Sequence, residues 1–295
     1  MEKEDYIKAG RIASETREYA RGKDWAGTTV LEICEEIESM IQSKGAKCAF
    51  PVNTSINEIA AHYTAEPNDT IVIQESDVLK IDLGAQINGN IADTAVTVSG
   101  DAESKILIQT AEIALSNAMS MIKNGTKSSD VGKLIEKTIK DRGFKPIINL
   151  SGHSLDTYTI HAGKSVPNVW SLGSFSFSSD TAYACEPFVT AKKGFGLVRN
   201  TKIKNIFAIK SRKKTKDEEA NKMLDFIWEK FNMLPFAQRW LNDWDVKESS
   251  KLLEFLTKKK MINAYPVLTE SSGQKVAQAE HTFIPQEKDI LITTK

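Results

Sequence analysis

The chain has 295 residues, which is enough for one large α/β domain or for one domain that carries an insertion. Lysine plus arginine equals aspartate plus glutamate, 39 each, so no overall charge draws the protein to nucleic acid or to a membrane. The amino-terminal sequence lacks the apolar core of a signal peptide, no apolar run is as long as a membrane span, and three widely spaced cysteines argue against a disulfide framework. We therefore expect a cytoplasmic protein with no membrane segment.

Two helices are predicted at the start of the chain. Apolar residues at helical spacing indicate a first helix over residues 5–22. A second helix is expected to begin at Thr29, because Thr29 and Glu32 fit a capping box, and to end at Gly45.

Strands are predicted next. Residues 50–63 contain many turn formers and predict extended chain, and residues 70–74 predict a strand. Residues 80–98 predict two strands joined by a turn at Asn88 and Gly89, since both residues tolerate positive φ.

This hairpin brings Asp82 and Asp93 together. With the turn at 88–89, Gly84 lies opposite Asp93 and Asp82 lies opposite Ala95, so the two carboxylates share a face roughly 7–8 Å apart. One of them must take up a proton, pair with a cation or bind a metal. The alternative is two surface aspartates on a solvated hairpin, but the apolar residues on both strands indicate a central hairpin, where unpaired charge is costly.

Two further helices are predicted after the hairpin. Asp101 can cap a helix that runs to about Lys123, with Met121 among the side chains that face inward. Ser129 begins another helix, which Gly143 ends.

The two halves of this region resemble each other. Each has a glycine-threonine pair, a helix, a glycine, a lysine and extended chain, and the interval from the second glycine to a histidine is 17 residues in one half and 18 in the other. The matched positions are Gly27, Gly45, Lys47 and His62, then Gly125, Gly143, Lys145 and His161. We interpret this as an internal duplication with a pseudo-twofold axis and a site between the halves. The alternative is chance similarity of short patterns that end helices.

The character of the chain changes at about residue 191. Residues 181–189 predict a strand on which Glu186 shares a face with Ala184 and Phe188, and a buried glutamate there needs a partner. Residues 192–216 contain ten basic side chains and no acidic one. Helices are predicted over 217–231, 235–241 and 249–258, and strands over 264–268, 276–283 and 289–294. We expect residues 192–272 to form a small helical, winged-helix-like subdomain inserted into a main domain of residues 1–191 and 273–295.

Five candidate metal ligands are spread along the chain on predicted strands or strand edges. They are Asp82, Asp93, His153, Glu186 and Glu280. Four carboxylates and one imidazole suit two divalent first-row ions and offset their charge. Bound water at such a centre loses a proton near neutral pH and becomes a nucleophile.

The motifs around these residues resemble a known family. They are IDLG and ADTA in the central hairpin, SGH at 151–153, IHAG at 160–163, the glutamate of CEPF, AEHTF at 279–283, and AFPVNTSINEIAAHY at 49–63. Over essentially the whole chain they are similar to type II methionine aminopeptidases of the archaeal kind. The resemblance implies an α+β pita-bread fold with pseudo-twofold symmetry. One departure, at residues 187–189, where many relatives carry a smaller, glycine-bearing sequence, bears on the shape of the pocket.

The resemblance also implies a function. Such an enzyme removes the initiator methionine from nascent proteins when the second residue is small, by attack of a metal hydroxide at a dinuclear site. Asp82 would chelate one ion, Asp93 and Glu280 would bridge both, and His153 and Glu186 would complete the other site, with Glu186 also moving a proton. Co, Mn, Fe, Zn and Ni all suit these ligands.

Other residues take roles by the same resemblance. His62 and His161 would contact the scissile amide and stabilise the oxyanion, although both can also be structural histidines. A pocket for the methionine side chain would be lined by Phe50, Ile160, Phe188 and Tyr265, and plain core packing is the alternative for these four. His281 follows a ligand directly, so strand alternation points it to the opposite face and a structural role is expected.

A basic run at 192–216 bears on the partners of the protein. It is either a solvated face or a contact with ribosomal RNA, and we expect a monomer that acts on nascent chains.

A proline-specific peptidase of the same fold is a second hypothesis. Such enzymes usually carry a separate amino-terminal domain, whereas here the fold is expected to begin near residue 5. A third hypothesis is a non-catalytic relative that binds RNA or ribosomes, which is expected to have lost metal ligands.

Overall fold

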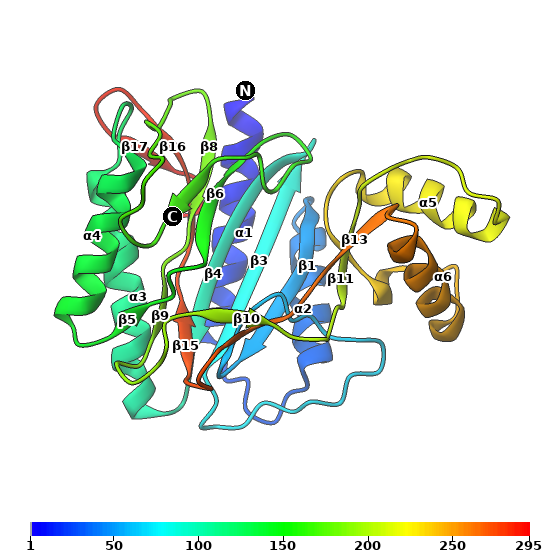
Figure 1. Cartoon of the computed structure of the whole chain (residues 1–295), viewed down its shortest axis with the longest axis horizontal. Coiled ribbons are helices and arrows are strands. Elements are labelled where there is room, and N and C mark those ends of the chain that lie inside the picture. The colour runs from blue at the N-terminus through cyan, green and yellow to red at the C-terminus, as the bar shows by residue number, and fades with distance from the viewer. Residues whose placement is uncertain (1) are drawn as a thin grey trace.

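The computed structural model describes residues 2–295 and shows helices and sheets in two similar halves with a third lobe at one side (Figure 1). In Figure 1, α1 and α2 lie behind the strands of the first half, α3 and α4 lie beside the second half at the left, and α5 and α6 project at the right. No helix within residues 2–295 is both long and apolar enough to cross a bilayer.

The first half contains two helices and a three-stranded antiparallel sheet of order β1-β3-β4. Its core is formed by the apolar faces of both helices against that sheet. The elements are α1 (Lys3–Gly22), α2 (Val30–Ser43), β1 (Lys47–Ile56), β2 (Ile59–Ala61), β3 (Leu79–Ile87) and β4 (Asn90–Val98).

The second half repeats the helix pair and places it against a five-stranded sheet of order β17-β16-β8-β6-β7 and a three-stranded sheet of order β15-β9-β5. The elements are α3 (Ala102–Met121), α4 (Ser128–Asp141), β5 (Lys145–Pro146), β6 (Ser151–Leu155), β7 (Ser165–Pro167), β8 (Ala182–Cys185), β9 (Phe188–Thr190), β15 (Val276–Gln278), β16 (His281–Pro285) and β17 (Ile290–Ile292).

The central hairpin and the start of α2 have the predicted geometry. Asn88 and Gly89 both have positive φ, 52° and 85°, and the register pairs Gly84 with Asp93. The capping box of α2 is present: the Thr29 hydroxyl accepts from the Glu32 amide, and the Glu32 carboxylate accepts from the Thr29 amide.

Matched backbone hydrogen bonds confirm the pseudo-twofold relation between the halves. The Gly27 amide donates to the carbonyl of Ile73, and the Gly125 amide donates to the carbonyl of Phe177, each at 2.9 Å. The Ile73 amide donates back to Thr28, and the Phe177 amide donates back to Thr126, again at 2.9 Å. The same backbone clasp therefore precedes the second helix of each half.

A seam of threonine hydroxyls joins β4 of the first half to β15 and β16 of the second. Thr97 Oγ1 donates to the Gln278 carbonyl at 2.6 Å and accepts from the Gln278 amide at 2.9 Å. Thr94 Oγ1 donates to the Glu280 carbonyl at 2.7 Å, and Thr282 makes the same kind of contact further along. Threonine side chains and one backbone bridge, between Ala95 and Glu280, therefore join the halves in place of a continuous ladder.

Two predicted elements and one predicted inward-facing side chain are wrong. Residues 70–74 form only an isolated bridge between Val72 and Thr29, because their partner is the short clasp before α2. Residues 235–241 are not an α-helix. Strand β12 (Phe236–Ala237) pairs with β11 (Ile206–Ile209), and Gln238–Trp240 make a single 3-10 turn, η1. Tertiary pairing overrides local propensity here. Met121 is 40% exposed, and Met119 is buried in its place.

Three predicted strands are each divided in the structure. Residues 264–268 fall at the end of β13 (Ile262–Tyr265) and the start of β14 (Leu268–Glu270), which belong to different sheets, with Pro266 between them. Residues 181–189 form β8 and β9 in different sheets, with a break at Glu186 and Pro187, since proline cannot donate to a ladder. Residues 276–283 form β15 and β16, with a break at Glu280. The breaks at Glu186 and at Glu280 coincide with candidate ligands.

The lobe at the right of Figure 1 has its own hydrophobic core, which lies between residues 207 and 262. It contains β11 (Ile206–Ile209), α5 (Glu218–Phe231), α6 (Val246–Lys258) and β13 (Ile262–Tyr265), and the sheet order is β12-β11-β13. Strands β10 (Val198–Asn200) and β14 (Leu268–Glu270) connect it to the main body, where β14 pairs with β2. We propose the division into residues 192–272 and the remainder on this basis.

Candidate metal centre

The five candidate ligands converge from both halves on one cavity of about 70 Å³. Asp82 and Asp93 come from the paired strands β3 and β4. His153 lies on β6, and Glu186 and Glu280 occupy two of the strand breaks described above. These breaks free both glutamates from a regular ladder and let their side chains turn toward the hairpin.

Short distances link these side chains. His153 Nε2 lies 3.6 Å from Asp93 Oδ2 and 3.6 Å from Glu186 Oε1. Asp93, His153 and Glu280 each offer one ligand atom, and these three atoms lie within 4.8 Å of one another. Gln278 Nε2 lies 3.2 Å from Asp82 Oδ2, so the side-chain amide also belongs to the cluster.

The electrostatics of the cluster fit a cation. Within residues 2–295, Asp82 Oδ1, Asp93 Oδ1, Glu280 Oε1 and His153 Nδ1 are buried side-chain atoms without a hydrogen-bond partner. Burial raises the pKa of Asp82 to about 7, and burial together with the neighbouring carboxylates raises the pKa of Asp93 and of Glu280 well above the ordinary value. Buried carboxylates that lie side by side repel one another, and bound divalent ions offset this repulsion. These residues could hold such ions.

Two histidines flank the ligands. His62 follows β2 in a left-handed conformation with φ of 66°, a strained geometry for a residue other than glycine and one that recurs at functional sites. Its Nδ1 lies 3.3 Å from the Pro266 carbonyl, and burial lowers its pKa to about 4, so the ring is neutral at pH 7. His161 packs edge-on against His153, with ring centroids 4.5 Å apart.

The apolar lining agrees in part with the residues predicted for a pocket. Phe50, Ile160 and Tyr265 line the cavity. Phe188 is not among the lining residues; it is buried in a separate core with Ala60, Ala61, Ile147, Val198 and Val276. The chain turns at Pro187 and enters another sheet, which takes the Phe188 side chain away from Glu186.

Several residues of the site were not predicted. Asn53, Ala61, Ile206 and Pro235 also line the cavity. The Gln278 amide lies 3.3 Å from both Glu186 Oε2 and Glu280 Oε2, as well as close to Asp82. The available signal for Gln278 was its position two residues before Glu280, which places both side chains on the same side of the chain.

His281 points away from the metal ligands, as expected from strand alternation. Its Nδ1 lies 3.0 Å from Arg17 Nη1 and 3.0 Å from Thr294 Oγ1. Arg17 also donates to Thr94 Oγ1 at 2.8 Å. His281 therefore ties α1 and the last residues of the chain to the back of the seam.

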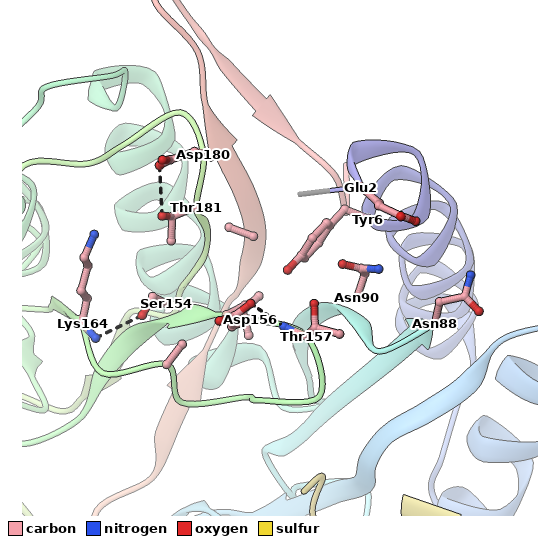
Figure 2. Close-up of a pocket in the computed structure, with 13 residues that line it drawn as sticks. Glu2, Tyr6, Asn88, Asn90, Ser154, Asp156, Thr157, Lys164, Asp180 and Thr181 are labelled. Atoms are coloured by element: carbon pink, nitrogen blue, oxygen red, sulfur yellow. Dashed lines mark hydrogen bonds between the residues drawn. The ribbon is translucent and has the colours of Figure 1, made fainter. Parts of the chain in front are cut away.

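A larger polar cavity of about 710 Å³ is lined by residues of α1, of β6 and of the loop that follows β6 (Figure 2). Figure 2 shows the Tyr6 ring pointing into it from α1, with Ser154 and Asp156 across from the ring. None of the five ligands lines this cavity. Its size alone therefore does not make it the reactive centre.

Sequence comparison identifies the class of protein. The profile of metallopeptidase family M24 matches residues 4–209, and the chain belongs to this family. A relative named methionine aminopeptidase from Methanocaldococcus jannaschii is 40% identical over 299 residues and covers 100% of both chains. Another from Thermococcus kodakarensis is 41% identical over 295 residues and covers 99% of both. The resemblance to archaeal methionine aminopeptidases is thus confirmed.

Solved structures confirm the pita-bread fold. A methionine aminopeptidase from Rickettsia prowazekii superposes with a TM-score of 0.71 at 19% identity and covers 100% of this chain and 98% of its own. A thermophilic Arx1 gives a TM-score of 0.81 at 17% identity and covers 98% of this chain and 89% of its own. Prolidase from Pyrococcus furiosus gives 0.63 at 16% identity, and this chain spans 64% of it.

Proposed function

We propose that the chain removes the initiator methionine from nascent proteins when the second residue is small, at a centre of two divalent metal ions. The proposal rests on one observation: five candidate ligands from both halves meet in one buried cavity, and several of their ligand atoms have no hydrogen-bond partner. The names of the relatives, methionine aminopeptidases of nearly identical length, support the substrate.

We assign Asp82 to one ion, Asp93 and Glu280 to both, and His153 and Glu186 to the other. When bound, Co, Mn, Fe, Zn or Ni would lower the pKa of water and polarise the scissile carbonyl. Glu186 is 13% exposed as a side chain and its pKa is raised, by burial first and by Asp82 second. A carboxyl group of that kind can accept a proton and return it to a leaving amine.

The two histidines bind the peptide bond. The Pro266 carbonyl can only accept a hydrogen bond, so neutral His62 carries its proton on Nδ1 and leaves Nε2 as an acceptor. We therefore assign His62 to the N–H of the scissile amide. His161, exposed at the cavity and packed against His153, is assigned to the carbonyl oxygen, where a donor stabilises developing negative charge.

The methionine side chain is assigned to the apolar wall of the cavity. Phe50, Ile160 and Tyr265 supply aromatic and aliphatic surface close to the ligands. Burial of such a thioether side chain contributes roughly 1.5–3 kcal/mol of binding free energy. Phe188 is not assigned to this wall because it lies in another core.

The proposal is tested by assaying free methionine released from Met-Ala-Ser by protein that has been stripped of metal and then titrated with each ion. We expect activity to return with divalent ion and to saturate. Release from an Xaa-Pro peptide at a higher rate would favour the proline-specific hypothesis instead. Failure to take up any metal would favour the non-catalytic hypothesis.

We also propose a setting and a partner. All ten basic side chains of residues 192–216 are exposed, and an exposed basic surface suits the phosphate backbone of RNA. A monomer acting in the cytoplasm on chains that leave the ribosome would use this surface for ribosome contact.

A further inference from the structure

The walls of the cavity come from two parts of the chain. Phe50 and Asn53 lie on β1 of the main body, whereas Ile206, Pro235 and Tyr265 belong to the lobe formed by residues 206–265. The shape of the cavity therefore depends on how firmly that lobe is held against the body.

A buried ion pair joins the lobe to the body. Arg239, on the 3-10 turn η1, forms a bidentate pair with Glu38 on α2, and the two side chains are 7% and 6% exposed. Trp240 Nε1 donates to Glu38 Oε2 at 2.9 Å. Every other ion pair in residues 2–295 that involves the lobe is exposed and lies within the lobe itself.

The same ion pair is hydrogen-bonded to β1, the strand that carries Phe50 and Asn53. Glu38 Oε1 accepts from the Val52 amide at 3.0 Å, and Val52 lies next to Asn53. Arg239 Nη2 donates to Thr64 Oγ1 at 3.1 Å, and that hydroxyl donates to the Val52 carbonyl at 2.7 Å. Thr64 follows His62 by two residues, so one cluster contacts the lobe, β1 and the segment that carries a candidate catalytic histidine.

We propose that Glu38 and Arg239 are a positioning pair that sets the width of the substrate cavity. Neither residue lines the cavity. The pair acts by fixing η1, and through it Pro235 on one wall, relative to Phe50 and Asn53 on the other. The kind of substrate assumed, a peptide with an amino-terminal methionine, rests on the proposed function.

The test uses the full chain loaded with metal. Glu38→Gln with Arg239→Gln removes both charges at once and leaves an acceptor for the Val52 amide, so no unpaired charge is buried. Arg239→Lys is the single variant, because it keeps a positive charge beside Glu38 and loses the bidentate pairing. Asp225→Asn with Lys214→Gln is the matched control, because Lys214 and Asp225 form an exposed pair in the same lobe, 58% and 59% exposed.

Two readouts are expected to change. KM for Met-Ala-Ser should rise at least about fivefold while kcat stays within about twofold, since substrate contacts are loosened and the reacting groups are not. Amide hydrogen exchange should accelerate at residues 206–209 and 236–241 and stay unchanged in α3. The control should behave as wild type in both readouts.

The proposal is overturned if amide exchange in the folded double variant is as slow as in the wild type. It is also overturned if exchange is faster while KM is unchanged. If the double variant does not fold, Arg239→Lys is judged under the same two readouts. If the wild-type protein cleaves no peptide, the proposed function fails. Exchange at residues 236–241 then still decides whether the pair fixes the lobe.

Discussion

The hydroxyl of Thr282 makes two hydrogen bonds to the backbone of Asp93: it accepts from the amide and donates to the carbonyl, each at 2.8 Å. Thr282 belongs to the second half and Asp93 to the first, and Thr282 is fully buried. A candidate ligand of one half is therefore held in place by a side chain of the other half.

Thr282→Val should weaken metal binding. Valine keeps the shape but removes both hydrogen bonds, so the buried Asp93 amide loses its partner at a cost of about 1–3 kcal/mol in the free energy of unfolding. Loss of a contact that orients a ligand commonly lowers metal affinity by about 10–100-fold. Calorimetric titration of stripped protein with Mn²⁺ or Co²⁺ measures this affinity.

Thr110→Val is the control for that variant. Thr110 is also fully buried, but its hydroxyl bonds the Ile106 carbonyl within α3. It should lose stability without losing metal affinity. Equal metal affinity in Thr282→Val and wild type would show that the seam does not orient Asp93.

Glu186→Gln and His153→Ala should each abolish cleavage of Met-Ala-Ser without unfolding the chain. The first removes a carboxylate that can accept a proton, and the second removes the imidazole that lies 3.6 Å from two carboxylates. A loss of at least about 10²-fold is expected for removal of a proton-transfer group. The release of methionine and the far-ultraviolet circular dichroism spectrum are measured on the same samples. Near-normal turnover in either metal-loaded variant would refute the assigned roles.

The structure shows why the ligands could be predicted from the sequence and part of their surroundings could not. Asp82 and Asp93 follow from a two-residue turn, because turn geometry fixes register and register fixes which side chains share a face. Asn53 could not be found in this way, since a single amide on a strand carries no spacing signal, and for Gln278 the only signal was its position two residues before Glu280. Their positions depend on contacts between segments far apart in the chain.

The errors in secondary structure have a similar origin. Residues 235–241 have apolar residues at helical spacing, but Phe236 and Ala237 pair with β11. The side-chain amide of Gln238 donates to Ser249 Oγ at 2.9 Å, near the start of α6. Glu38 and Arg239 are 201 residues apart, and each is an ordinary surface residue type. Only the folded chain reveals that they meet.

Lys80→Met should destabilise the loop that leads to His62. Lys80 is fully buried, and its Nζ donates to the Val276 carbonyl at 2.8 Å and to the Asn57 carbonyl at 3.0 Å. The substitution takes this donor from the buried Val276 carbonyl and removes one of two donors to the Asn57 carbonyl, which costs about 1–3 kcal/mol in the free energy of unfolding. Urea unfolding gives this value. Lys105→Met, at an exposed helix position, is the control and should change stability little.

Glu270→Gln should lower stability at pH 7 and lose its effect in acid. Burial alone would raise the pKa of Glu270, but hydrogen bonds from Ser272, Gln274 and Phe195 outweigh burial and hold the pKa below its ordinary value. A folded pKa below the unfolded one gives stability that is present above about pH 4.3 and is lost as the pH falls through the folded pKa.

The midpoint of thermal unfolding is measured for wild type and Glu270→Gln from pH 7 to pH 3. The difference between them should shrink below about pH 4. Glu254→Gln, at an exposed ion pair, should show a small difference throughout. A constant difference across the whole pH range would mean that the Glu270 charge contributes nothing.

Neutralising Lys213 and Lys214 should weaken ribosome association in a salt-dependent way. Both side chains are exposed, and loss of two phosphate contacts reduces the slope of binding against salt by about two. Co-sedimentation with ribosomes at several salt concentrations measures this. Lys214 also pairs with Asp225, so Asp225→Asn serves as the control for loss of that pair. Unchanged co-sedimentation of the lysine variant at low salt would remove the proposal.

The two halves repeat one backbone pattern, seen in the clasps at Gly27 and at Gly125, and they meet through β4 of the first half and β15 and β16 of the second. A polypeptide of half this length would leave that strand edge open to water, where an identical copy could cover it. In the single chain that association no longer depends on concentration. The two edges are then free to differ, with aspartates on one and glutamates and an imidazole on the other.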